Sequence, residues 1–165
     1  MLSVDAISLA ADLSSREIPY YSPRIYNPVE PNKRGGGNCV ARTAIFLAIA
    51  SKITEPHSSS SQVFFKNGKI KHARAVILLE NDPTRALIAD SGNDGIGGFL
   101  GKTWYRFVDW DPQNTEKIKL SKFRKRESGW KLISPDKFSK ELIGVDWDIL
   151  CPKILDLAGL RSVVA

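Results

Sequence analysis

The sequence predicts a single α+β domain over residues 1–165, with helices first and a meandering antiparallel sheet after them. Three observations point to this class: the length of 165 residues, an Ala-rich apolar run directly after three glycines, and a middle region of short apolar runs separated by turn sequences. A chain of this length can bury one core, and separated runs of helix and strand are typical of the α+β class. No repeat and no long linker divides the chain.

The N-terminal part is expected to hold two helices with an extended segment between them. Residues 3–15 place apolar side chains at helical spacing. Four prolines between Pro19 and Pro31 exclude a helix there, because proline removes a backbone donor and fixes φ. Glycines 35–37 favour a loop, and the Ala-rich residues that follow predict a buried helix over 38–53.

The middle of the chain is expected to form strands joined by turns. A loop over 54–61, rich in serine, precedes a hairpin whose turn is Asn67-Gly68, a strong hairpin signal. The strands are predicted over 62–66, 69–79, 85–90, 103–110, 117–123 and 129–133. A turn over 81–84 and a glycine-rich loop over 91–101 separate some of them.

The C-terminal part is expected to return to helix. Ser134 is a capping residue and Pro135 suits the first helical position, so a helix should begin there. A last helix is expected over about 146–160. The helix over 38–53 should pack against the sheet.

Composition narrows the classes of protein to consider. The chain carries 24 basic and 18 acidic residues, a net charge of +6, and seven of the basic residues lie in Lys117–Lys131. A solvated hairpin face explains this stretch best. The alternative is a non-enzymatic protein that binds RNA or an acidic protein surface, because Phe123 and Trp130 are interleaved with the basic residues.

Other function classes are disfavoured by what the sequence contains. No run reaches the ~18 apolar residues of a membrane helix, and the N-terminus does not resemble a secretory signal. The expected location is therefore the cytoplasm, or a host cell reached by a route that the sequence does not show. Two cysteines and two histidines nearly exclude structural zinc, and no cofactor is expected.

Three residues have the right types and order for thiol catalysis. Cys39 should begin a helix, where the dipole and free N–H groups favour a thiolate. His72 opens the most apolar strand, 33 residues later, and Asp90 closes the next strand after 18 more. In such a triad Cys39 attacks a carbonyl, His72 transfers the proton and Asp90 orients the imidazole. Each residue alone is more often structural, so the prediction rests on their conjunction.

Strand parity gives this hypothesis a test. A tight turn of only Asp82-Pro83 would place Asp90 and His72 on opposite faces of the sheet. An odd-length loop centred on Asn81 or Asp82, or a bulge, would place them on one face, where opposed and diagonal pairs lie within ~8 Å. The triad hypothesis therefore predicts an odd loop or a bulge.

The motifs Gly37-Asn38-Cys39, His72 and Asp90 resemble the papain-like fold in its transglutaminase-like arrangement. Within this superfamily, residues 34–39 and 88–92 are similar to arylamine N-acetyltransferase motifs, whereas the spacing is more similar to bacterial transglutaminase-like cysteine proteinases and deamidase effectors. The resemblance covers about residues 34–92. It implies a nucleophile helix packed on an antiparallel sheet and an acyl-enzyme formed on Cys39.

Departures from these families shape the functional expectation. The helical segment before Cys39 is far shorter than in the acetyltransferases, and the papain oxyanion glutamine is replaced by Lys33. The backbone N–H of Cys39 with Asn32 or Asn38 are the oxyanion candidates. A loop containing Gly92, Gly95, Gly97 and Gly98 is a candidate for gating the substrate. We expect a cysteine peptidase acting on a protein or peptide, with a glutamine deamidase or an amide or acyl transferase as alternatives.

Overall fold

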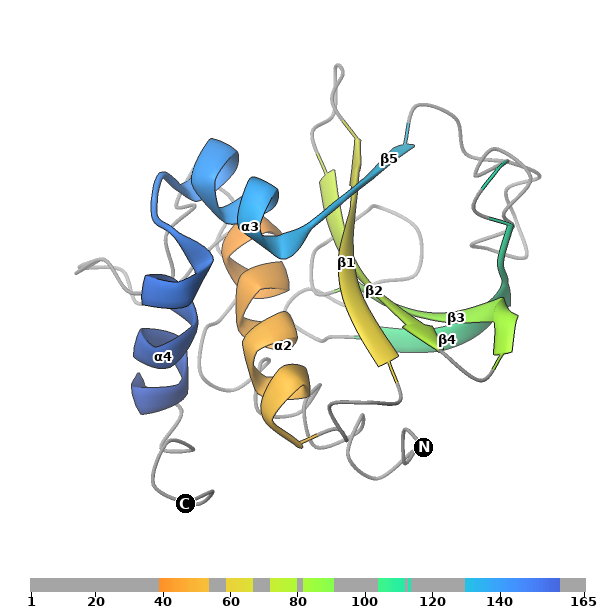
Figure 1. Ribbon diagram of the computed structural model, residues 1–165, viewed down its shortest axis with the longest axis horizontal. Coiled ribbons are helices and arrows are strands. Elements are labelled where there is room, and N and C mark those ends of the chain that lie inside the picture. Colours follow the sequence, from red (N-terminus) through yellow and green to blue (C-terminus); the bar gives the residue numbers. More distant parts are fainter. Residues whose placement is uncertain are drawn as a thin grey trace.

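Helices gather on one side of a five-stranded sheet in this protein (Figure 1). The structure is a computed structural model that describes residues 39–53, 59–66, 72–79, 82–90, 104–111, 113 and 130–157. The helical elements are α2 (Cys39–Ile53), α3 (Pro135–Phe138), the π-helical turn η2 (Ser139–Ile143) and α4 (Trp147–Leu157). The strands are β1 (Ser59–Lys66), β2 (His72–Leu79), β3 (Asp82–Asp90), β4 (Trp104–Asp109) and β5 (Trp130–Ile133).

The sheet has the strand order β4-β3-β2-β1-β5, and every neighbouring pair is antiparallel. The first four strands follow each other as a meander. The last strand, β5, instead returns to the free edge of β1, with Val63 opposite Ile133 and Lys66 opposite Trp130. The predicted α+β class with an antiparallel sheet is therefore confirmed.

Most element predictions agree with the structure within a few residues. The helix predicted over 38–53 is α2, and the strands predicted over 103–110 and 129–133 are β4 and β5. Ser134 caps α3 as predicted, because its hydroxyl accepts a hydrogen bond from the Lys137 N–H at 3.2 Å and Pro135 follows it. The last helix, α4, is described from Trp147 to Leu157.

Two predicted boundaries were wrong. The serines at 59–61 belong to β1 rather than to a loop, since they pair with Leu79, Leu78 and Ile77 of β2. The third strand begins at Asp82 rather than Arg85, because Asp82 pairs with Leu79 across a register shift. In both places backbone pairing with β2 outweighs the local preference of serine, aspartate and proline for turns.

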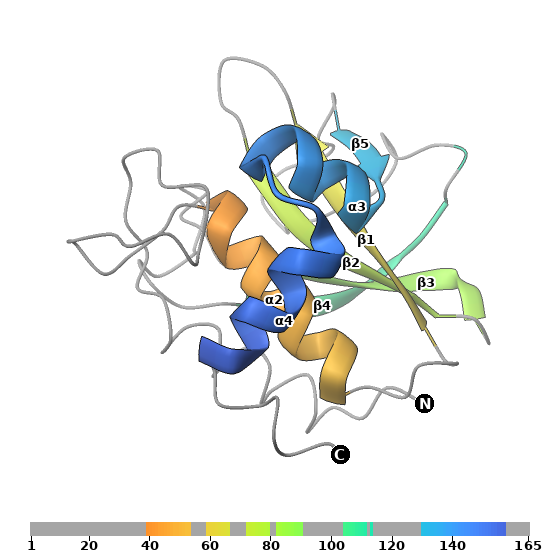
Figure 2. The same cartoon turned by 60° about the vertical axis from the view of Figure 1, so that its left-hand side comes forward.

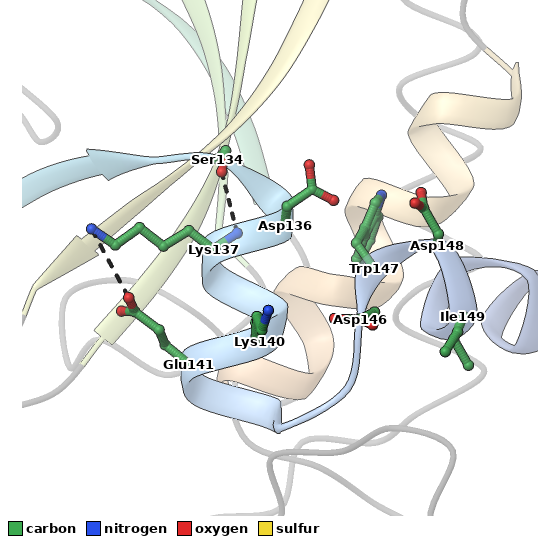
Figure 3. Close-up of a pocket in the computed structure, with 9 residues that line it drawn as sticks. All are labelled: Ser134, Asp136, Lys137, Lys140, Glu141, Asp146, Trp147, Asp148 and Ile149. Atoms are coloured by element: carbon green, nitrogen blue, oxygen red, sulfur yellow. Dashed lines mark hydrogen bonds and ion pairs between the residues drawn. The ribbon is translucent and has the colours of Figure 1, made fainter.

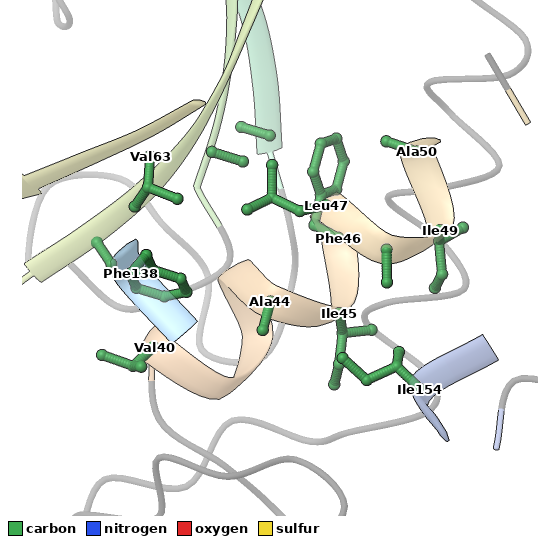
Figure 4. Packing of buried hydrophobic residues seen from close by; sticks show 14 of the residues in the cluster. Val40, Ala44, Ile45, Phe46, Leu47, Ile49, Ala50, Val63, Phe138 and Ile154 are labelled. Carbon is green, nitrogen blue, oxygen red and sulfur yellow. The ribbon is translucent and has the colours of Figure 1, made fainter. Parts of the chain in front are cut away.

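Helix α2 lies between the sheet and α4 (Figures 1 and 2). Its residues from Cys39 to Ala50 are all buried, so both sides of the helix contribute to the core. The facing positions of the sheet are small, with Ala73, Ala75 and Ala89 at 0–3% exposure, and this allows a close approach of the helix. Figure 4 shows Phe138 beside Val40 and Ile154 beside Ile45.

The opposite face of the sheet carries a second apolar cluster. Its buried members are Val76, Ala86, Ile88, Val108, Trp110 and Trp130. Residues alternate between the two clusters along β2 and β3, as the pleat of a strand requires. None of the helices described is long and apolar enough to cross a membrane.

The remaining element predictions fall outside the described residues. These are the helix over 3–15, the proline-rich segment, the turn at Asn67-Gly68 and the strand over 117–123.

Candidate active site

Cys39 is the first residue of α2, and its side chain is buried at 8% exposure. One turn later, the Thr43 hydroxyl donates a buried hydrogen bond of 3.1 Å to the Ala73 carbonyl oxygen of β2. Ala73 directly follows His72. The start of α2 is therefore fixed beside the start of β2.

His72 opens β2 and is buried at 7% exposure. Its imidazole contacts the indole of Trp130 edge-on, with ring centroids 6.0 Å apart and the planes at 74°. The register explains this contact, because Lys66 of β1 lies opposite both His72 and Trp130. The two rings consequently project from the same face of the sheet, with β1 between their strands.

Asp90 is the last residue of β3 and pairs with Trp104 of β4. On its other side, β3 pairs with β2 through Ala75–Ala89 and Val76–Ile88, and the register shifts between Leu78 and Leu79. Continued past Ala75, this register places Asp90 on the same face as His72 and diagonal to it. The bulge or odd loop that the triad hypothesis requires is thus present, and the parity prediction is confirmed.

The two faces of the sheet separate the backbone positions of the triad. Ala73 and Ala75 face α2, so His72, which precedes Ala73, and the register position of Asp90 belong to the face of the second apolar cluster. The structure therefore brings together the register positions of His72 and Asp90. It brings Cys39 to the same end of the sheet, but on the side of its other face.

Arg74 is a buried charged neighbour of His72 to which no sequence motif pointed. It lies two residues after His72 on the same face, is buried at 2% exposure, and its guanidinium carbon lies 4.6 Å from the centre of the Trp130 ring. The register places it opposite Asp90. Period-two alternation from His72 was a signal that could have found it, because a basic residue inside an apolar strand needs a specific environment.

A second buried basic residue, Arg42, lies in α2 three residues after Cys39. Its exposure is 0%, so a full positive charge is held in the protein interior one turn from the candidate nucleophile. No sequence motif pointed to Arg42, which lies in a run that is otherwise largely apolar.

Cys151, the other thiol, has a different setting. It lies half-buried in α4, and both cysteines are free. Burial raises the pKa of the Cys151 thiol above its ordinary value, although a hydrogen bond with Ser51 and the charge of Lys52 oppose this rise. A thiol that holds its proton is a poor nucleophile at neutral pH, as expected for an inert structural cysteine.

Several predicted site residues lie outside the described residues. These are the oxyanion candidates Asn32 and Asn38, the gating-loop residues Gly92, Gly95, Gly97 and Gly98, and the basic stretch up to residue 129. Of that stretch the structure describes Trp130, which is buried, and Lys131, which is exposed. Among the described residues, no group of three or more His, Cys, Asp or Glu side chains is arranged to hold a metal ion.

Comparison with protein-family models, with curated proteins and with solved structures finds no match for this chain.

Proposed function

We propose that the protein is a thiol enzyme that attacks an amide bond through an acyl-enzyme on Cys39, as a cysteine peptidase. The β2–β3 register carries the proposal. It puts His72 and the position of Asp90 on one face, and a tight turn without a bulge would have separated them. A glutamine deamidase or an acyl transferase would use the same three residues, and these activities differ only in what resolves the intermediate.

The proposal places the reaction at one end of the sheet. Cys39 and His72 are each the first residue of their element. The Thr43–Ala73 hydrogen bond joins the two elements one turn into α2 and one residue into β2. A side chain at the end of a strand can be reached from either face without crossing the sheet. The thiol and the imidazole would meet around this end, with the imidazole also in contact with the Trp130 ring.

The chemistry then follows the order of a thiol triad. His72 takes the proton of Cys39, and the sulfur adds to the amide carbonyl carbon. The imidazolium gives that proton to the leaving amine as the C–N bond breaks, which leaves a thioester on Cys39. Water, deprotonated by His72, hydrolyses the thioester and restores the thiol.

The experiment that tests this proposal is the alkylation of the two thiols by iodoacetamide at mildly acidic pH, followed by peptide mass spectrometry. Cys39 should react at least about tenfold faster than Cys151, because His72, its proposed base, would accept the thiol proton as the sulfur attacks. His72→Ala should remove this advantage, and the matched control His57→Ala should preserve it. Equal, slow labelling of both cysteines in the wild-type protein contradicts the proposal.

Turnover of a denatured protein substrate gives the second measurement. Cys39→Ala and His72→Ala should each abolish it, and Asp90→Ala should leave a small residual rate, because an unoriented histidine still transfers protons. Circular dichroism of each variant checks that the fold is intact. A fully active Cys39→Ala protein would exclude the mechanism.

A further inference from the structure

A groove of about 560 Å³ lies between the α3–η2 segment and the start of α4 (Figure 3). Asp136 and Lys140 line it from the first segment, and Asp146, Trp147, Asp148 and Ile149 line it from the second. Its volume lies within the range of binding pockets in proteins. The groove is formed by elements that the thiol mechanism does not use.

Two apolar side chains, Trp147 and Ile149, lie among the polar and charged residues that line the groove. Ile149 is 51% exposed and is the only large apolar side chain counted as exposed among the described residues. Trp147 beside it is half-buried, so part of its ring area faces the groove. Exposed apolar side chains that line a concavity are typical of interaction sites.

Carboxylates surround this apolar area. Figure 3 shows Asp136 on one side of Trp147 and Asp148 on the other. Including Glu141 and Asp146, the lining holds four carboxylates against the two ammonium groups of Lys137 and Lys140, a net charge of −2. Within the described part of the chain, the ion pair formed by these groups is Lys137–Glu141 at 4.0 Å, which leaves the three aspartates available to a ligand. An aromatic ring flanked by carboxylates suits a cationic ligand.

The sequence supplies a segment of complementary character. Residues 117–126 contain six Lys or Arg and no acidic residue, so they account for the whole net charge of +6 and leave the rest of the chain with 18 of each sign. Ile118, Leu120 and Phe123 are interleaved with these charges. The segment thus offers the two features that the groove requires, which are positive charge and apolar side chains.

We propose that the groove binds the basic stretch 117–126 of a second copy of this chain. Contacts between exposed charges are individually weak and are screened by salt, whereas Trp147 and Ile149 add an apolar contribution. The association should therefore be modest in strength and strongly dependent on ionic strength. This proposal goes beyond the thiol chemistry and does not depend on it.

Sedimentation velocity of the full chain over a range of concentrations tests the proposal. Oligomers should form at about 0.01 M salt, where the Debye length is about 30 Å, and should dissociate at about 1 M salt, where it is about 3 Å. The groove variant Asp136→Lys/Asp148→Lys should be monomeric at low salt. The control variant Asp109→Lys/Asp111→Lys makes the same change in net charge at exposed positions outside the groove, and it should associate like the wild type.

A charge swap makes the test specific. The stretch variant Lys119→Glu/Lys122→Glu/Lys125→Glu/Arg126→Glu leaves two basic residues against four acidic ones in residues 117–126, a net charge of −2. It should be monomeric alone, because its groove, which also carries a net charge of −2, and its stretch then repel. Mixed with the groove variant, it should form a mixed oligomer, since the reversed stretch fits the reversed groove. Urea unfolding of each variant checks its fold.

Three results would overturn the proposal. The first is a wild-type protein that stays monomeric at low salt at every concentration, which includes the case where the stretch binds the groove of its own chain. The second is a groove variant that associates like the wild type. The third is the absence of mixed oligomers in the charge swap, which would assign the groove to a basic segment of another protein.

Discussion

Trp130 contacts the side chains of both His72 and Arg74. Its ring receives the Arg74 guanidinium at 4.6 Å and the edge of the His72 imidazole at 6.0 Å, and it is itself buried at 7% exposure. An aromatic face stabilises a desolvated cation, so a smaller side chain would remove packing and cation–π stabilisation together.

This arrangement gives a prediction for Trp130. Trp130→Ala should lower the free energy of unfolding by about 3–5 kcal/mol, as measured by urea denaturation. Trp130→Phe should lose clearly less, because a ring remains for both contacts. Equal losses in the two variants would show that the ring contacts contribute nothing beyond buried area.

Cys151 gives a prediction about pH. Because burial raises the pKa of this thiol in the folded protein above its ordinary value of 9.0, the folded state keeps the proton to higher pH than the unfolded state. The resulting stabilisation is complete below the ordinary value and is lost as the pH rises through the raised one. In urea titrations from neutral pH upward, the wild type should therefore lose more stability than Cys151→Ala, and parallel curves would contradict this.

At the scale of elements, small side chains determine how closely α2 approaches the sheet. Ala44 and Ala48 of the helix and Ala73, Ala75 and Ala89 of the strands are all buried at 0–3% exposure. No larger side chain fits between them without moving the helix, and that movement would also displace the start of α2 from the start of β2.

Ala75→Leu tests this close packing. The added volume should lower the free energy of unfolding by about 1–3 kcal/mol, because overpacking forces strained rotamers or a backbone shift. Lys131→Leu, which introduces the same side chain at an exposed position of β5, is the matched control and should change stability little. A tolerated Ala75→Leu would show that the helix lies farther from the sheet than the structure places it.

Local sequence signals correctly predicted those elements whose patterns are compatible with only one type of structure. The glycines before Cys39 and the Ser134-Pro135 cap give the starts of α2 and α3 to within one residue. The serines at 59–61 were wrongly predicted to form a loop, because pairing with β2 overrides their preference for turns. No local sequence pattern indicates that β2 is their partner. For His72 and Asp90, the sequence could state only what the triad requires, which is a bulge or odd loop that places both on one face. Whether the bulge at Leu78–Leu79 forms depends on the pairing of β3 with β2, which no local pattern indicates.

The candidate site could likewise be predicted only in part, because part of it depends on strand pairing. Residue types and strand ends indicated Cys39, His72 and Asp90. The environment of His72, however, comes from β5, some sixty residues further along the chain, and β5 reaches it only by returning to the edge of β1. The amino-acid sequence indicated neither the return of β5 to the edge of β1 nor the burial of Arg74.

At the scale of the whole molecule, one sheet serves two apolar clusters. Ile77 of β2 packs with α2 on one face, and Ile88 of β3 lies in the cluster on the other face, while Val76 and Leu87 next to them point the opposite way. Each strand therefore contributes to both clusters at alternate positions. Neither cluster can be lost while the strands stay paired, so the two should unfold together.

Matched truncations on the two faces test this coupling. Ile77→Ala and Ile88→Ala each remove the same atoms from a site of 0–1% exposure, and each should lower the free energy of unfolding by about 2–5 kcal/mol. In both variants the urea midpoint should fall with an unchanged slope, and tryptophan fluorescence should coincide with far-ultraviolet circular dichroism. Fluorescence and circular dichroism that separate in Ile88→Ala but coincide in Ile77→Ala would show that the face carrying His72 and Trp130 can loosen while the helical face stays folded.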